Sequence, residues 1–62
     1  MIKAIYPMGI GLAVEILEAN EVFVKWKWSN ETKLHKSFVN KNNKFRVNRI
    51  WISLDDCMRT NI

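Results

Sequence analysis

Alternation of side-chain character with a period of two is the feature that most constrains the fold of this chain. Residues 12–16 and 22–28 both place an apolar residue at every second position, and those residues are mostly β-branched or aromatic. A period of two belongs to a strand with one buried face, whereas a helix repeats every 3.6 residues. The short link at residues 18–21 predicts a tight hairpin between the two strands, with Asn20 able to adopt a positive φ.

The rest of the chain also has the pattern of short strands separated by turn-forming residues. Polar clusters at residues 29–32 and 40–43 are typical of turns, and they predict strands at 33–39, 44–48 and 50–54. Asparagines in the second turn suit the left-handed conformation.

Both ends of the chain carry their own signals. Residues 1–7 alternate too, but Pro7 has no amide hydrogen, so we expect an edge segment or a strand end there. Ser53 followed by Asp55 could cap a final helical turn, and residues 59–62 are expected to fray.

The pattern as a whole predicts an all-β fold, a small five-stranded antiparallel barrel that spans residues 1–62 as one domain. The chain has 62 residues and is 48% hydrophobic, which suits one small core and excludes disorder by composition. A helical bundle is the alternative, and the β-branched alternation disfavours it. The predicted core is Leu12, Val14, Ile16, Val22, Val24, Leu34, Phe38, Phe45, Val47 and Ile50, with Trp26 on the same parity.

Positive charge is concentrated in the middle of the chain. Residues 25–49 hold eight lysines and arginines against Glu31 alone, while the flanking segments are mildly acidic and the whole chain carries +4. Such asymmetry indicates a polyanionic partner or an acidic protein surface.

Lysines and aromatic residues share the predicted outer face of the second strand. Lys25 and Lys27 are two residues apart, about 7 Å along a strand, which is close to the phosphate spacing of an extended nucleic acid. Phe23 has the same parity, and Trp51 points outward if its isoleucine neighbours point inward. Stacking a base on such a ring is worth about 1–3 kcal/mol.

The full set of candidate nucleic-acid- or partner-binding residues combines these positions with neighbouring strands. We expect a third strand to bring lysines and a histidine alongside, and a fourth to bring Arg46 onto the same surface, with Glu15 at its boundary. The set is Phe23, Lys25, Lys27, Trp28, Lys33, His35, Lys36, Lys44, Arg46, Arg49 and Trp51.

Catalytic and metal chemistry are not expected. Cys57 is the only cysteine and His35 the only histidine, so neither a zinc site nor a Cys–His pair has its remaining groups. No phosphate-binding glycine-rich loop precedes a helix. We therefore expect no enzymatic activity, no metal and no cofactor.

The segment from residue 9 to residue 40 resembles an SH3-like barrel of the Tudor/KOW kind, and it is similar to the small C-terminal module of UvrD/PcrA-type DNA helicases. The matching pieces are the Gly9-Ile10-Gly11 turn, the strand at 12–16, Val22-Phe23-Val24-Lys25-Trp26, and Lys33-Leu34 running to Phe38. The resemblance implies a binding module that contacts nucleic acid or RNA polymerase, and no catalysis. Trp28 and the residues beyond Val39 depart from the family pattern. The Lys-, Asn- and Ile-rich composition is similar to that of small bacteriophage or bacterial accessory proteins.

Two functions follow as hypotheses. The first is sequence-nonspecific binding of DNA or RNA through the phosphate backbone. The alternative is a small adaptor or inhibitor that docks on an acidic patch of a nucleic-acid enzyme such as RNA polymerase, a helicase or a nuclease. Exposed sheet edges allow a homodimer. A single cysteine indicates a cytoplasmic setting, that of the host for a phage protein, and the longest uncharged run is too short to span a membrane.

Overall fold

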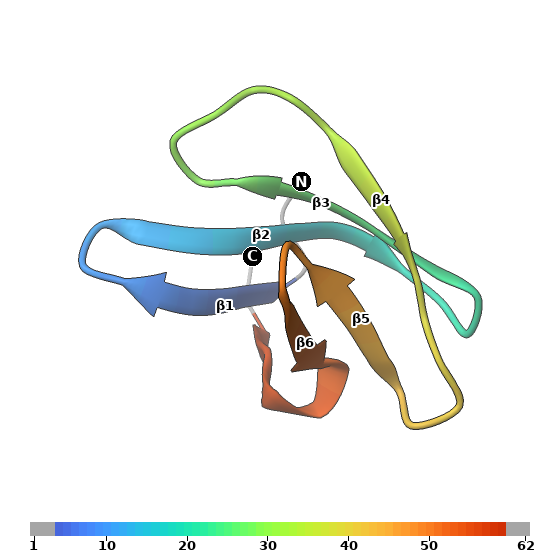
Figure 1. The fold of residues 1–62 in the computed structure, drawn as a ribbon. Helices are drawn as coiled ribbons and strands as arrows, with labels where there is room; N and C mark the ends of the chain where they lie inside the picture. The colour runs from blue at the N-terminus through green and yellow to red at the C-terminus, as the bar shows by residue number, and fades with distance from the viewer. Residues whose placement is uncertain (1–3, 60–62) are drawn as a thin grey trace.

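The alternating segments form strands, as their period predicts. The structure, a computed structural model, describes residues 4–59 and contains one 3-10 turn among the strands (Figure 1). The elements are β1 (Ala4–Gly9), β2 (Leu12–Ala19), β3 (Phe23–Trp28), β4 (His35–Phe38), β5 (Lys44–Val47), β6 (Ile50–Ser53), η1 (Leu54–Asp56) and β7 (Met58–Arg59).

The strands form two antiparallel sheets. The larger has the order β4-β3-β2-β1-β7, and β5 and β6 form a two-stranded hairpin. The predicted all-β antiparallel fold is confirmed, but residues 4–59 form seven strands where five were predicted. The hydrogen-bonded ladders of the described residues do not close into a barrel, because only the isolated bridge between Val39 and Phe45 joins the sheets.

One hydrophobic core lies between the two sheets. In Figure 1 the hairpin strands run at a steep angle to β1 and β2, so the small sheet crosses one face of the large one. The buried side chains come from both layers: Val14, Ile16, Val24 and Trp26 from the large sheet, and Phe45, Val47 and Ile52 from the hairpin. Side chains on the other parity of each strand therefore point away from the core.

The sequence prediction assigned the wrong face of β4 to the core. Leu34 and Phe38 were expected in the core, but they are 64% and 70% exposed. The cause is the register with β3, in which Trp26 pairs with His35 and Val24 with Ser37. Directly paired residues share one face of a sheet, so the buried residues of β3 bring the opposite parity of β4 inward.

Three other core predictions fail at strand ends. Val22 and Ile50 are exposed, Leu12 is only half-buried, and Ile52 takes the buried position on β6 instead. Val22 precedes β3 and lies in the hairpin turn, where its amide donates to Asn20 Oδ1 over 2.7 Å. Leu12 and Ile50 are the first residues of their strands and Val22 precedes one, whereas Ile52 lies within β6.

Asparagine side chains and backbone shape the turns. The hairpin at Asn20 forms as predicted, but Asn20 has no positive φ; its Oδ1 accepts from the amides of Val22 and Phe23 instead. Positive φ occurs at Asn43 (62°), in the predicted asparagine turn, and at Asn48 (55°), in the β5–β6 turn.

The first and last strands of the described residues pair with each other. β7 pairs with Ala4 and Ile5, so β1 is an inner strand at these two residues and not an edge. Pro7, nearer the end of β1, has no partner in β7. The predicted cap is present, since Ser53 Oγ accepts from the Asp55 amide at 3.2 Å. Arg59 belongs to a strand and not to a frayed tail; residues 1–3 and 60–62 lie outside the described part of the chain.

Trp26 and Trp51 make a matched pair for testing this core. Trp26 is 4% exposed and Trp51 is 52% exposed. Trp26→Ala should lower the free energy of unfolding by about 3–5 kcal/mol, because a large cavity forms. Trp51→Ala should cost less than about 1 kcal/mol. Urea denaturation followed by circular dichroism measures both, and equal losses would contradict this assignment of the core.

Candidate nucleic-acid interface

Two aromatic rings and two lysines meet on the outer face of the large sheet. Phe23 on β3 pairs with Phe38 on β4, and Lys25 pairs with Lys36. The Lys36 ammonium lies 4.5 Å from the centre of the Phe23 ring and 5.9 Å from that of Phe38, while Lys25 Nζ lies 5.8 Å from Phe23. We call these four residues the β3–β4 patch.

The β3–β4 patch places two lysines side by side, with Glu18 of β2 opposite Lys25 on its other side. Like charges directly opposite each other on a sheet destabilise it, and contact with an aromatic face offsets only part of that cost. Lys25 and Lys36 form no ion pair with any carboxylate among residues 4–59. Lys36, on the edge strand, has no acidic residue opposite it in the described ladders, so an anionic ligand would add counter-charge there.

Lys27 differs from the other predicted lysines, because the protein already uses its charge. Its ammonium lies 2.9 Å from a Glu15 carboxylate oxygen and donates to the carbonyls of Trp28 at 3.0 Å and Glu31 at 2.9 Å. The side chain is only 23% exposed. Glu15 therefore lies beside Lys27, as expected, and Glu18, which pairs with Lys25, borders the patch on the β2 side.

His35 and the β3 tryptophans occupy the inner side of the sheet. The prediction that His35 lies on the outer face is wrong. Its ring stacks on Trp26, with ring centres 4.3 Å apart and planes 14° apart. Its Nε2 is buried without a hydrogen-bond partner in the described part of the chain. Trp28 is half-buried and meets Trp26 edge-on at 5.5 Å. His35 and the two tryptophans would have to leave these positions in order to contact a large ligand.

A second basic and aromatic surface lies on the outer face of the hairpin. Arg46 pairs with Trp51, and its guanidinium carbon is 5.9 Å from the centre of the indole. Arg46 Nε donates to the Asn48 carbonyl at 3.0 Å, which orients the guanidinium. Lys44 lies two residues earlier on the same outward parity. The outward orientation of Trp51 agrees with the sequence prediction.

The predicted site residues thus lie on two different sheets and in the loops between strands. Arg46 is outward-facing as expected, but on the second sheet rather than beside Lys25 in the first. Lys33 and Arg49 are exposed in loops outside the strands. Phe38 was missed because it was assigned to the core. The sequence did carry a signal that Phe38 is exposed. Lys36 lies two residues before it, and residues two apart on a strand share one face.

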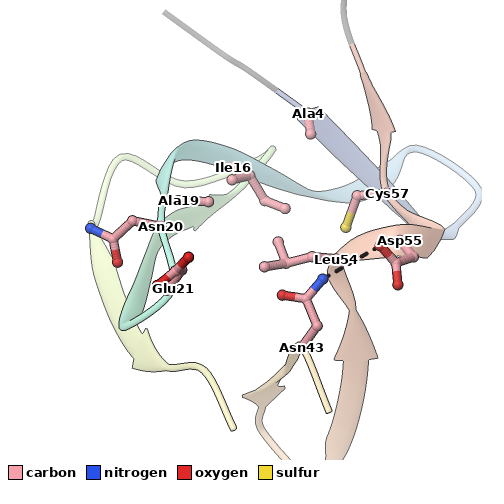
Figure 2. Close-up of a pocket in the computed structure, with 9 residues that line it drawn as sticks. All are labelled: Ala4, Ile16, Ala19, Asn20, Glu21, Asn43, Leu54, Asp55 and Cys57. Atoms are coloured by element: carbon pink, nitrogen blue, oxygen red, sulfur yellow. Dashed lines mark hydrogen bonds between the residues drawn. The ribbon is translucent and has the colours of Figure 1, made fainter. Parts of the chain in front are cut away.

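A hollow of about 500 Å³ near the β2–β3 turn has different chemistry. Figure 2 shows Ile16 and Leu54 beside its centre and Glu21 at one side, with Asn43 donating to Asp55 Oδ1 at 3.4 Å. None of its nine lining residues is basic. Its carboxylates disfavour a polyanion at this end of the molecule.

Cys57 also lines this hollow, and its thiol is expected to have low reactivity. Burial, together with the negative charge of Asp56, raises the pKa of the thiol from 9.0 to about 11. The Sγ atom lies 3.5 Å from the Ser53 carbonyl oxygen. Within residues 4–59, no three histidine, cysteine or acidic side chains are grouped so that they could hold a metal ion.

Comparison with models of protein families, with curated proteins and with solved structures finds no match for this chain. In the part of the chain described, no helix has the length and apolar character that crossing a membrane requires.

The contacts of Lys27 predict that it supports the fold, whereas Lys25 does not. Lys27→Met should lower the free energy of unfolding by about 1–2 kcal/mol, since it removes charged hydrogen bonds to two carbonyls and the ion pair with Glu15. Lys25→Met should change it by less than about 0.5 kcal/mol. Urea denaturation of the two variants compares them directly, and the idea fails if their stabilities are the same.

The Cys57 thiol should react slowly in the folded protein. With a pKa of about 11 in place of 9.0, the thiolate fraction at pH 8 falls about 100-fold, and the thiolate is the nucleophile. Alkylation by iodoacetamide, followed by mass spectrometry with and without urea, measures this. The raised pKa also links Cys57 to the pH dependence of stability. The unfolded protein loses the thiol proton near pH 9 and the folded protein only near pH 11, so the free energy of unfolding should decline between these pH values. Equal alkylation rates in the two states would refute the assignment.

Proposed function

We propose that this protein is a non-catalytic module that binds DNA or RNA without sequence specificity through the β3–β4 patch. The observation that carries the proposal is the direct pairing of exposed Lys25 with exposed Lys36, neither of which forms an ion pair within residues 4–59, beside two phenylalanine rings. Exposed cations interleaved with aromatic rings are the usual equipment for binding a nucleic-acid backbone and its bases.

Each pair of the patch has a separate role in this proposal. The two ammonium groups contact phosphates and release counterions, which provides affinity but carries no sequence information. Phe38, with 70% of its surface exposed, offers a ring for base stacking, and every base has a face that can stack. The patch has no amide or guanidinium group to read base edges, so we expect little preference for sequence.

We also propose that the two sheets together form a partly open SH3-like barrel. Three features support this: the last strand returns to pair with the first, the hairpin crosses the large sheet over a single core, and one bridge links β4 to β5 at the corner. Such barrels are frequent carriers of binding surfaces, but function depends on the site and not on the fold.

An acidic protein surface is the second candidate partner. The outer edge of β4 forms no ladder with another strand of residues 4–59, and Leu34 and Phe38 are exposed beside it. A strand of a nucleic-acid enzyme that carries carboxylates could pair with this edge and neutralise Lys36. The module would then be an adaptor or inhibitor and would show little affinity for free nucleic acid.

Reversing the charge of both patch lysines tests the primary proposal. Lys25→Glu/Lys36→Glu should abolish the binding of a fluorescein-labelled oligonucleotide in anisotropy titrations, while stability changes by less than about 1 kcal/mol. For the unmodified protein, the logarithm of affinity should fall linearly with the logarithm of salt concentration, with a slope near 0.7 for each phosphate contacted on a single strand.

A charge-matched control separates the patch from net charge. Lys33→Glu/Lys41→Glu alters the same number of charges in loops outside the patch, and it should weaken binding much less. If both double variants lose affinity equally, binding follows total charge and the patch is not the site. If neither protein nor variant binds nucleic acid, the adaptor hypothesis becomes the better one.

A further inference from the structure

We propose that the ligand is a single strand, and that it follows a basic–aromatic track which leaves the β3–β4 patch, turns the corner at β4 and β5, and continues over the outer face of the hairpin. This inference rests on the proposed function and adds the substrate class. The track consists of Phe23, Lys25, Lys36, Phe38, Lys44, Arg46 and Trp51.

The two surfaces are connected at the corner by direct contacts. Val39 and Phe45 form the bridge between β4 and β5, and the Ser37 hydroxyl donates to the Arg46 carbonyl at 2.8 Å. Val39 and Phe45 both turn towards the core. Side chains alternate along a strand. Their neighbours Phe38 and Arg46 therefore both turn outward, on adjacent segments of the chain. The outer surface therefore continues from one sheet to the other.

The hairpin face offers the same two kinds of group as the patch. Trp51 is 52% exposed, and the Arg46 guanidinium lies 5.9 Å from the centre of its ring. An indole is a larger stacking surface than a phenyl ring, and a guanidinium can bind a phosphate or stack on a base. Since Arg46 Nε is already held by the Asn48 carbonyl, little side-chain freedom is lost when it binds.

Acidic residues border the track on both sides but are nearly absent from it. Between Phe23 and Ser53 the only acidic residue is Glu31, which lies in the β3–β4 loop. Glu15 and Glu18 border the track on β2, where Glu18 pairs with Lys25, and Asp55 and Asp56 follow it on η1. A polyanion that leaves the track on either side meets carboxylates, so repulsion as well as attraction defines its path.

The curvature of the track selects a flexible ligand. The two faces lie on opposite sides of the core of a molecule that measures 30 × 28 × 20 Å. Duplex DNA has a persistence length of about 150 bp, so it cannot bend around an object this small and would contact one face only. A single strand bends freely, and its unpaired bases are available to stack on Phe38 and Trp51.

Anisotropy titrations with oligothymidylate and with a duplex of the same length test the inference. The single strand should bind at least about 10-fold tighter. Trp51→Ala should weaken single-strand binding about 5- to 100-fold, the effect of losing one stacked contact, and should leave duplex binding unchanged. Ile10→Ala is the matched control, because it truncates an exposed apolar side chain in a turn outside the track, and it should have no effect.

The outcomes separate this inference from the proposed function. If the duplex binds as tightly as the single strand, or if Trp51→Ala binds oligothymidylate normally, the track is refuted while nucleic-acid binding through the β3–β4 patch stands. Two oligonucleotides bound at once to one protein would also refute it, because the faces would then be separate sites. Failure to bind any nucleic acid would refute the proposed function itself. Circular dichroism of each variant excludes unfolding as the cause.

Discussion

The indole of Trp26 is the interaction on which the rest of the structure depends. Its ring is buried between the two sheets, and its Nε1 donates to Ser37 Oγ at 2.9 Å. Ser37 in turn donates to the Arg46 carbonyl at 2.8 Å. This chain of hydrogen bonds runs from β3 through β4 to β5, where only one backbone bridge joins the sheets. Because a buried indole N–H is stabilised by an acceptor, Trp26 helps to specify where the hairpin docks, and with it the outward direction of Arg46.

How far the fold could be predicted depends on the position of each strand. For the interiors of β2 and β3 the alternation was sufficient, because both are inner strands with one face on the core. The sequence from Leu34 to Val39 permits either parity, since it has apolar residues on both. Pairing with Trp26 and Val24 decides between them, and a shift of one residue exchanges every side chain between core and surface. Register of this kind is a tertiary property that a short strand does not encode alone.

The candidate site was predictable in part for the same reason. Charge asymmetry and parity identified Lys25 as outward, and the outward direction of Trp51 followed from its isoleucine neighbours. Parity alone could not distinguish Lys25 from Lys27, because the difference comes from Glu15 across the sheet and from two carbonyls near the strand end. Phe38 illustrates the opposite error, in which an aromatic residue was assigned to the core on hydrophobicity alone. Hydrophobicity predicts burial well for strand interiors and poorly for the last residue of an edge strand.

The position of Lys36 on an edge strand also affects how copies of this chain behave at high concentration. An unpaired strand edge is a template for the edge of another copy, and growth of that kind leads to aggregates. Two β4 strands that pair antiparallel about their middle residues would bring Lys36 of one copy close to Lys36 of the other, on a face that already holds Lys25. The resulting repulsion opposes self-assembly in dilute salt and weakens as salt screens it. Solubility of the free protein should therefore depend on the same side chain that a polyanion would neutralise.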